Sequence, residues 1–400
     1  MELIERFADL VVRAGANVQP GQLVVVRADT AHLPIVRAVV ERAYSAGASW
    51  VEPVLTDGPI RRSAVDHATV EALSASRPWA LEQIREWDAS RAAMIALAGD
   101  PLPHLMDGAD PARAAAVRAE ELTILREAYM SGRMRWTVGA APNPGWATQV
   151  FGEPDVDRLW AAVATAMRLD EDDPVAQWRE RTATLAARAA ALDALALDEV
   201  RYVGEGTDLT VGLIPGCRWT GGGLVDPDGV DYLPNIPTEE VFTSPDKSRA
   251  EGVIRLTKPL ALAGRLVTGL RLEFKDGRIT DVTAESNVDT VRAQLEAPGA
   301  RHLGEVSLVD RDSRIARAGI VFHNTLFDEN AGCHVAWGQS FPFAVPGGPQ
   351  MTAEERGALG LNTASVHTDV VIGGEGITVT GRGPGGPVDI IRDDVWVLTP

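Results

Sequence analysis

The feature that most constrains the fold is a change of pattern near Asp198. Before this point, short apolar runs alternate with stretches whose apolar residues recur at helical spacing. That order predicts an open α/β sheet with largely parallel strands. The expected strands are 23–26, 50–55, 93–97 and 136–140, and the expected helices are 33–46, 110–131, 155–168 and 173–196.

After Asp198 the chain consists of short runs with alternating apolar and polar residues, separated by glycine-rich turns. This pattern predicts an α+β region with a mixed or antiparallel sheet. Asp276-Gly277, between two such runs, is typical of a hairpin. A chain of 400 residues also suits two domains. We therefore predict an N-terminal α/β domain over residues 1–197 and a C-terminal domain over residues 198–400.

The charge and the apolar pattern exclude several classes of partner. A formal net charge of −18 argues against nucleic acid, because phosphate neutralisation needs clustered Lys and Arg. Charged residues interrupt the apolar stretches, so no membrane span is expected. The N-terminal segment reads as an amphipathic helix, not a signal peptide. Cys217 and Cys333 are too few for a disulfide framework, which points to a reducing, cytoplasmic location.

Metal-binding residue types gather in the second half of the chain. No HExxH helix, Walker loop or GxSxG elbow occurs. Of the 7 histidines, His334 lies in the run FDENAGCHVAWG, and His367 precedes Asp369 by two residues in NTASVHTDVVIGG. Residues two apart on a strand face the same side, where imidazole and carboxylate can converge on one ion. His302 and His323 have no such neighbour. Taken singly, the spacing favours an ordinary role for each residue, as a member of an ion pair or as a solvated carboxylate in a turn.

Four segments together resemble the aminopeptidase T family of thermophilic metallo-aminopeptidases, which includes aminopeptidase S and PepS. They are NIPTEEVFTSPDKSRAEG, LGEVSLVDRDSRI, FDENAGCHVAWGQSFP and NTASVHTDVVIGG. The resemblance implies two divalent ions per chain and a homodimer that acts on short peptides. It also implies the metal ligands Glu251, Glu305, His334, His367 and Asp369. Carboxylate and imidazole ligands without thiolate suit zinc, cobalt or manganese comparably.

The same resemblance raises a question about catalysis. The family has a tyrosine after the ligand histidine, where this chain reads WGQSFP and has Phe341. If that hydroxyl stabilises an oxyanion, its loss slows turnover by roughly a hundredfold or more. Glu251 and Glu305 are the candidate catalytic carboxylates, although ligation would restrict both. Glu240 is a further carboxylate that could support the site, but the sequence favours a solvated or strand-end role for it. The alternatives are an amidase for another amine-bearing small molecule and a metal-binding protein that has lost its chemistry.

Overall fold

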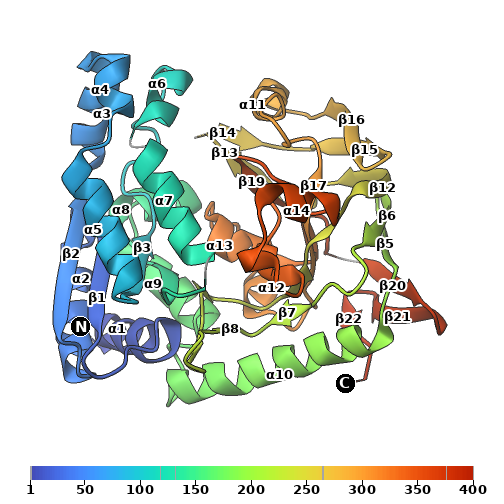
Figure 1. Ribbon diagram of the computed structural model, residues 1–400, viewed down its shortest axis with the longest axis horizontal. Helices are drawn as coiled ribbons and strands as arrows, with labels where there is room; N and C mark the ends of the chain where they lie inside the picture. The colour runs from blue at the N-terminus through green and yellow to red at the C-terminus, as the bar shows by residue number, and fades with distance from the viewer. Residues whose placement is uncertain (1, 118, 131, 264, 375, 400) are drawn as a thin grey trace. The chain divides into compact units, whose positions relative to one another are not determined.

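The computed structural model describes residues 2–117, 119–130, 132–263, 265–374 and 376–399. The chain forms two compact units (Figure 1). The first comprises Met1–Arg179 and Gly223–Ile236, and the second comprises Glu180–Gly222 and Pro237–Pro400.

The first unit is built on a parallel sheet in the order β10-β4-β3-β1-β2. Its strands are β1 (Leu23–Asp29), β2 (Trp50–Thr56), β3 (Ala93–Ala98), β4 (Trp136–Ala140) and β10 (Asn235–Ile236). Val24, Val25 and Val26 are fully buried, which explains why β1 reads as a continuous apolar run. The predicted open α/β sheet is confirmed.

The helices of this unit follow the apolar spacing of the sequence. Helix α1 buries Phe7 and Leu10 on one face and leads into a single π turn, η1 (Val11–Gly15). The helical bounds are α1 (Glu2–Leu10), α2 (Leu33–Ser45), α3 (Gly58–His67), α4 (Val70–Ser74), α5 (Pro78–Ala89), α6 (Pro111–Ala116), α7 (Ala119–Met130), α8 (Pro144–Phe151) and α9 (Val156–Ala166), with the 3-10 turn η2 (Thr30–His32). The segment expected as one helix over 110–131 is thus α6 followed by α7.

The division between the units differs from the predicted boundary at 197/198. Helix α10 (Pro174–Leu195) lies mostly in the second unit, because Leu185, Ala189 and Leu192 pack in the core of that unit. The segment 223–236 returns to the first unit, where β10 pairs with β4. This segment also contains the short pair β8 (Leu224–Val225) and β9 (Asp231–Tyr232).

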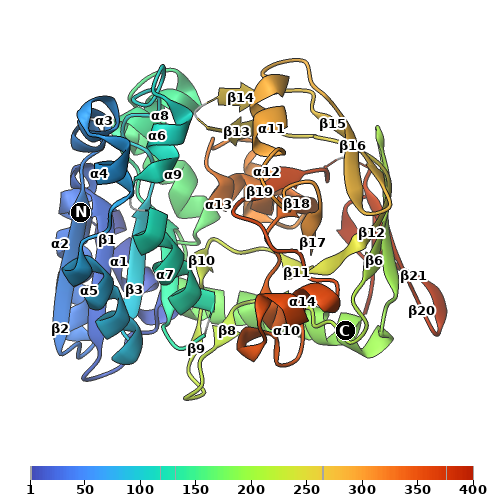
Figure 2. The ribbon, with the colours of Figure 1, turned by 45° about the horizontal axis from the view of Figure 1, so that its top comes forward.

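Among the described residues, the second unit contains two antiparallel sheets of more than two strands. The first, called the β12 sheet, has the order β16-β15-β12-β6-β5-β20-β21-β22. Its strands β12, β15 and β16 lie side by side in Figure 2. The bounds are β5 (Glu199–Gly204), β6 (Thr207–Leu213), β12 (Pro245–Arg255), β15 (Arg271–Lys275), β16 (Arg278–Thr283), β20 (Thr378–Gly383), β21 (Gly386–Arg392) and β22 (Val395–Trp396). The hairpin predicted at Asp276-Gly277 is confirmed, since Lys275 pairs with Arg278.

The other sheet, called the β17 sheet, has the order β19-β18-β17-β11-β7. Its strands are β7 (Thr220–Gly221), β11 (Val241–Thr243), β17 (Leu303–Leu308), β18 (His334–Gly338) and β19 (His367–Val371). A separate hairpin joins β13 (Leu260–Leu262) to β14 (Arg265–Val267). The predicted antiparallel character of this half of the chain is confirmed.

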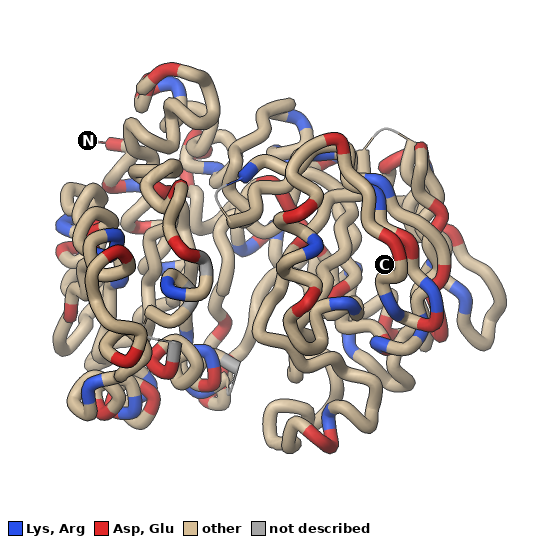
Figure 3. The backbone as a smooth tube through the Cα atoms, turned by 90° about the horizontal axis from the view of Figure 1, so that it is seen from above, with Lys and Arg blue, Asp and Glu red and all other residues tan. Residues whose placement is uncertain are grey.

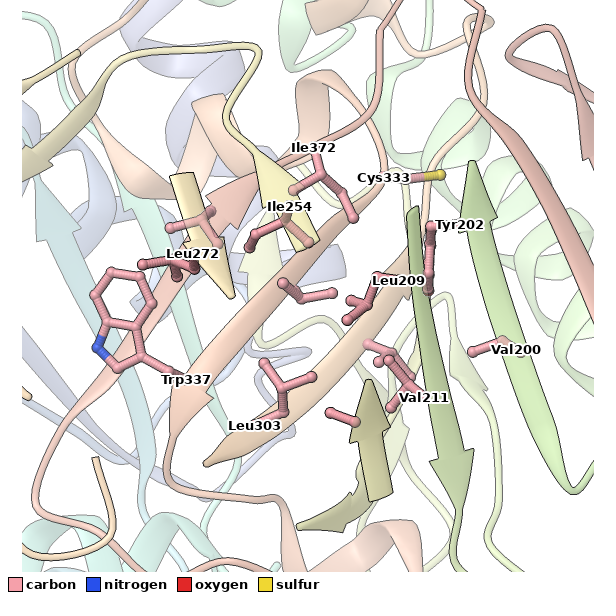
Figure 4. Packing of buried hydrophobic residues seen from close by; sticks show 14 of the residues in the cluster. Val200, Tyr202, Leu209, Val211, Ile254, Leu272, Leu303, Cys333, Trp337 and Ile372 are labelled. Carbon is pink, nitrogen blue, oxygen red and sulfur yellow. The ribbon is translucent and has the colours of Figure 1, made fainter. Parts of the chain in front are cut away.

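One apolar core joins the two sheets of the second unit. Tyr202 and Leu209 of the β12 sheet and Leu303 and Trp337 of the β17 sheet are buried in one cluster (Figure 4). Cys333 belongs to the same cluster, and its Sγ faces the Val309 carbonyl at 3.4 Å. The β17 sheet therefore has one face in the core and leaves its other face for polar side chains.

Short helices connect these strands. They are α11 (Val288–Gln294), α12 (Arg314–Ala318), α13 (Thr325–Asp328) and α14 (Ala353–Ala358), with the 3-10 turns η3 (Glu329–Ala331), η4 (Pro342–Ala344) and η5 (Gly348–Gln350). Across the residues that the structure describes, no helix combines the length and apolar character needed to cross a membrane.

Candidate metal centre

The alternation of β17 places polar side chains on the outer face of its sheet. Val306 and Leu308 are buried in the core cluster. Because successive side chains of a strand point to opposite faces, Glu305 and Ser307 share the face away from that core. The run LGEVSL thus supplies both a core face and a polar face.

The neighbouring strands extend this polar face. Ala336 of β18 pairs with Glu305 on one side and with Asp369 of β19 on the other. Residues directly opposite each other in a sheet share a face, so the small Ala336 side chain lies between two carboxylates. His334 and His367 stand two residues from Ala336 and Asp369 on the same face.

Glu305 connects the two imidazoles. Its Oε2 lies 3.1 Å from His367 Nε2, and its Oε1 lies 3.8 Å from His334 Nε2. Asp369 Oδ1 is 3.3 Å from the same His367 nitrogen. Glu305 and His334 are buried, whereas 26% of the His367 side chain is exposed. The cluster is therefore accessible on the His367 side.

Glu240, immediately before β11, completes the group on the His334 side. Its Oε2 lies 3.0 Å from His334 Nε2 and accepts a hydrogen bond of 2.7 Å from the Ser307 hydroxyl. Glu240, Glu305 and His334 form one possible ligand set, and Glu305, His367 and Asp369 form a second. The two sets share Glu305.

Backbone carbonyls orient both imidazole rings. His334 Nδ1 lies 3.2 Å from the Gly332 oxygen, and His367 Nδ1 lies 2.7 Å from the Gln339 oxygen. A proton on each Nδ1 satisfies these carbonyls and leaves each Nε2 to bind a metal ion or, when protonated, to donate to the carboxylates. This arrangement is typical of histidines that bind a metal.

The electrostatics of the cluster show an excess of buried negative charge. Burial alone would lower the pKa of His334, but hydrogen bonds and charges from Glu240 and Glu305 raise that pKa well above its ordinary value. Burial raises the pKa of Glu329 well above its ordinary value, and the charges of Asp369 and Glu240 add to the effect. Glu329 therefore lies within the field of the same carboxylates. Buried acids in this number favour a nearby cation, which can be a protonated imidazole or a metal ion.

The donor set fits divalent metal ions. Within each of the two sets, the possible ligand atoms all lie within 4.8 Å of one another. They are imidazole nitrogens and carboxylate oxygens without thiolate, a combination suited to zinc, cobalt or manganese. Cys333 is directed at the Val309 carbonyl in the core. The predicted ligands Glu305, His334, His367 and Asp369 are brought together, and Glu305 occupies the shared position.

Glu251 is not brought to this cluster. It lies on β12, a strand of the other sheet, where Ala250 is buried in the core and Glu251 is exposed on the opposite face. Its Oε1 accepts a hydrogen bond from the Asp276 backbone N–H at 2.5 Å. The strand period thus directs this carboxylate away from the core and into the β15–β16 turn. Glu240 therefore takes the place of Glu251 in the set of possible ligands.

Phe341 forms part of an aromatic cluster beside the open side of the centre. Its ring centroid lies 5.1 Å from that of His367. It stacks on Phe343 at 5.2 Å and meets Phe242 edge-on at 5.3 Å. The Phe341 N–H donates to the buried Ser244 hydroxyl at 2.8 Å, which fixes this segment. All three rings are half-buried, so they present an apolar wall next to a candidate ligand.

Helix α10 fixes the segment that carries Glu240. Arg181 Nε lies 2.6 Å from Glu239 Oε2, and the Glu239 side chain is fully buried. The Glu239 N–H donates to Asn330 Oδ1 at 2.6 Å, which joins this segment to the turn containing Glu329. On the next turns of the helix, Arg188 lies 2.6 Å from Asp310. Buried ion pairs thus position the backbone on two sides of the cluster.

We expect Arg181→Met to lower the free energy of unfolding by up to about 3–5 kcal/mol, because it removes the cation from a buried carboxylate. Arg218→Met is the matched control. Arg218 pairs with Asp193 of the same helix, but 63% of its side chain is exposed, so the expected change is about 0–1 kcal/mol. Urea unfolding of both variants measures the difference. Equal losses would contradict a structural role for the Arg181 pair.

A buried set of possible nitrogen and oxygen ligands that is accessible on one side is typical of metalloenzymes that catalyse hydrolysis. Comparison with known proteins agrees with this class. Residues 1–396 match the family described as thermophilic metalloprotease (M29). The chain is 37% identical to aminopeptidase 2 of Geobacillus stearothermophilus over 407 residues, which cover 99% of this chain and 98% of that protein.

Aminopeptidase T of Thermus aquaticus is also 37% identical, over 99% of both chains. Wild-type AmpT from Thermus thermophilus has the same fold, with a TM-score of 0.90, 35% identity and 99% coverage of both chains. The chain therefore belongs to the M29 family of metalloproteases, and the predicted membership of the metallo-aminopeptidases is confirmed.

Proposed function

We propose that the protein hydrolyses the N-terminal residue from short peptides and holds two divalent ions for this reaction. The observation that supports the proposal most is Glu305, whose two oxygens face different imidazoles. The proposed ligands are Glu240, Glu305, His334, His367 and Asp369. When bound, a pair of ions supplies a Lewis acid for the scissile carbonyl and lowers the pKa of the attacking water.

Hydrogen bonds within the chain orient two of the proposed ligands. Ser307 holds one oxygen of Glu240 by a hydrogen bond of 2.7 Å, and the Gln339 carbonyl holds the His367 ring. Substrate access is expected on the His367 side, because the other ligands of the cluster are more buried. The rings of Phe242, Phe341 and Phe343 would exclude water there and contact the substrate's apolar parts.

Phe341 favours a second candidate function. It stands at the position of the family tyrosine, and its contacts are aromatic. A pocket with an apolar wall in place of a hydroxyl would suit a specialised amidase acting on another amine-bearing small molecule. In either case the substrate carries a free amine.

A substrate panel tests both candidates. We expect the protein, loaded separately with zinc, cobalt or manganese, to release N-terminal residues from di- and tripeptides and from aminoacyl amides. The N-acetylated form of each substrate is the control, and it should resist hydrolysis because its amine is blocked. Turnover of a single amide supports the second candidate. Metal binding without turnover of any free-amine substrate, or equal cleavage of blocked and free substrates, would overturn the proposal.

A further inference from the structure

The second unit contains a cavity whose lining differs from the candidate metal centre. Its volume is about 370 Å³. It lies between the start of β12, the β15–β16 hairpin and the segment that follows α11, three parts that Figure 2 shows next to one another. None of the proposed metal ligands lines it. The volume falls in the range of small-molecule sites, roughly 300–1,000 Å³.

The lining is basic in an acidic protein. Lys247, Arg278, Arg301 and His302 line the cavity, and Glu296 is the one carboxylate among its lining residues. Glu296 forms an ion pair with Arg301 at 2.7 Å. Lys247, Arg278 and Arg301 outnumber the single lining carboxylate, although the whole chain has a net charge of −18. In Figure 3, acidic and basic residues are scattered along the backbone of both units.

Two of the cations have no carboxylate partner. Among the described residues, no acidic group lies within ion-pair distance of Lys247 or Arg278. Other basic residues of β12 are paired. Arg249 lies 2.7 Å from Asp198, and Arg255 lies 3.1 Å from Glu205. The lack of a carboxylate partner is therefore specific to Lys247 and is not shared by the other basic residues of β12.

Hydrogen bonds fix the polar floor of the cavity. His302 Nδ1 lies 2.9 Å from the Lys247 carbonyl and 3.0 Å from the Gly277 carbonyl, so that this N–H is used by the backbone. The buried Asn362 amide donates to the Gly299 carbonyl at 2.7 Å and to the Gly338 carbonyl at 2.6 Å. Gly277 has a positive φ, and a Cβ there would lie 2.1 Å from the Lys247 oxygen. The walls are thus closely packed.

We propose that this cavity binds the oxyanion group of a small molecule, either a phosphate or a carboxylate. Guanidinium groups donate paired hydrogen bonds to such oxyanions, and the Lys247 ammonium adds a point charge. An apolar ligand would leave these charges uncompensated. The inference goes beyond the peptidase reaction and does not depend on it.

The position of the cavity connects it to the catalytic strands. His302 immediately precedes β17, and its carbonyl accepts a hydrogen bond of 2.8 Å from Gly338 at the end of β18. Asn362 is linked to Ser340, next to Phe341, by a hydrogen bond of 2.9 Å. A bound oxyanion would therefore contact residues that join directly to the strands of the metal centre.

Isothermal titration of the intact protein with inorganic phosphate and with acetate, at matched ionic strength, tests this inference. We expect at least one probe to bind, and the comparison of the two decides which oxyanion is preferred. Lys247→Gln combined with Arg278→Gln should weaken binding at least about tenfold, because it removes two charged contacts. Arg265→Gln, a control in the same unit with an exposed side chain, should leave binding unchanged.

Oxyanions can also bind metal ions, so Glu305→Gln is titrated in parallel. Binding that persists in Glu305→Gln and is lost in the Lys247 and Arg278 double variant supports the cavity. The reverse pattern assigns the anion to the metal centre and overturns the inference. Failure of both probes to bind the parent protein overturns it as well. Circular dichroism of the double variant confirms that its fold is retained.

Discussion

Glu305→Gln is expected to reduce the bound metal and to lower kcat/KM by at least about a hundredfold. The magnitude follows from the position of this carboxylate between both imidazoles, 3.1 Å from His367 and 3.8 Å from His334. Loss of a residue that only supports a ligand already costs about 10–100-fold in metal affinity or activity. Loss of the shared carboxylate removes a charge from both ligand sets at once. Elemental analysis and steady-state kinetics on one peptide measure the two effects.

Glu251→Gln is the matched control for this experiment. It makes the same chemical change at a carboxylate that accepts a hydrogen bond from the Asp276 N–H and is exposed on the other sheet. Metal content and kcat/KM should therefore stay at the parent values. Glu240→Gln should behave like Glu305→Gln, because Glu240 lies 3.0 Å from His334. Loss of metal from the Glu251 variant, with retention in the Glu240 variant, would restore the ligand set that the sequence predicted.

Local alternation explains which side chains of each strand face the site. In EVSL and HVAWG the apolar positions form one face and the chemistry-bearing positions form the other, which follows from the two-residue period of a strand. Leu303, two residues before Glu305, reaches the core through a bulge between these two residues. His367 and Asp369 share a face for the same reason. These relations lie within one strand, so no knowledge of distant pairing is needed.

The position of Glu240 depends on distant pairing and could not be predicted in this way. It comes immediately before β11, and its place beside His334 depends on the pairing of β11 with β17, in which Val241 lies opposite Leu308. Glu251 follows eleven residues later on a strand of a different sheet. Sequence spacing does not reveal which carboxylate stands in which sheet, since that depends on strand order. Glu239, next to Glu240, is instead paired with Arg181.

Local sequence patterns also could not predict where the chain divides into its two units. The texture changes near Asp198 because β5 begins there, but α10 before it already packs with the second unit. The short strand β10 joins the parallel sheet of the first unit only after the chain has passed through residues 180–222 of the second unit. A strand of two residues carries too little pattern for sequence analysis to assign its sheet.

Phe341→Tyr is expected to raise kcat on simple peptides by up to about a hundredfold while KM changes little. A hydrogen bond to an oxyanion strengthens only in the transition state, so it acts on kcat. Phe341 is half-buried and lies 5.1 Å from the His367 ring, which places its ring beside the accessible side of the cluster. Metal content should be unchanged, because none of the candidate ligands is altered.

Phe343→Tyr separates this role from a general effect of a new hydroxyl. Phe343 stacks on Phe341 at 5.2 Å but does not stand at the family position, so its variant should retain the kcat of the parent. If Phe341 instead serves as the apolar wall of a pocket for another substrate, the added hydroxyl lacks a partner and lowers turnover of that substrate. An unchanged or lower kcat for Phe341→Tyr on every substrate of the panel would therefore refute the oxyanion role of the absent tyrosine. A rise in kcat for both Phe341→Tyr and Phe343→Tyr would assign the gain to the added polarity of the aromatic cluster. A hydroxyl that acts at one position should raise kcat in Phe341→Tyr alone.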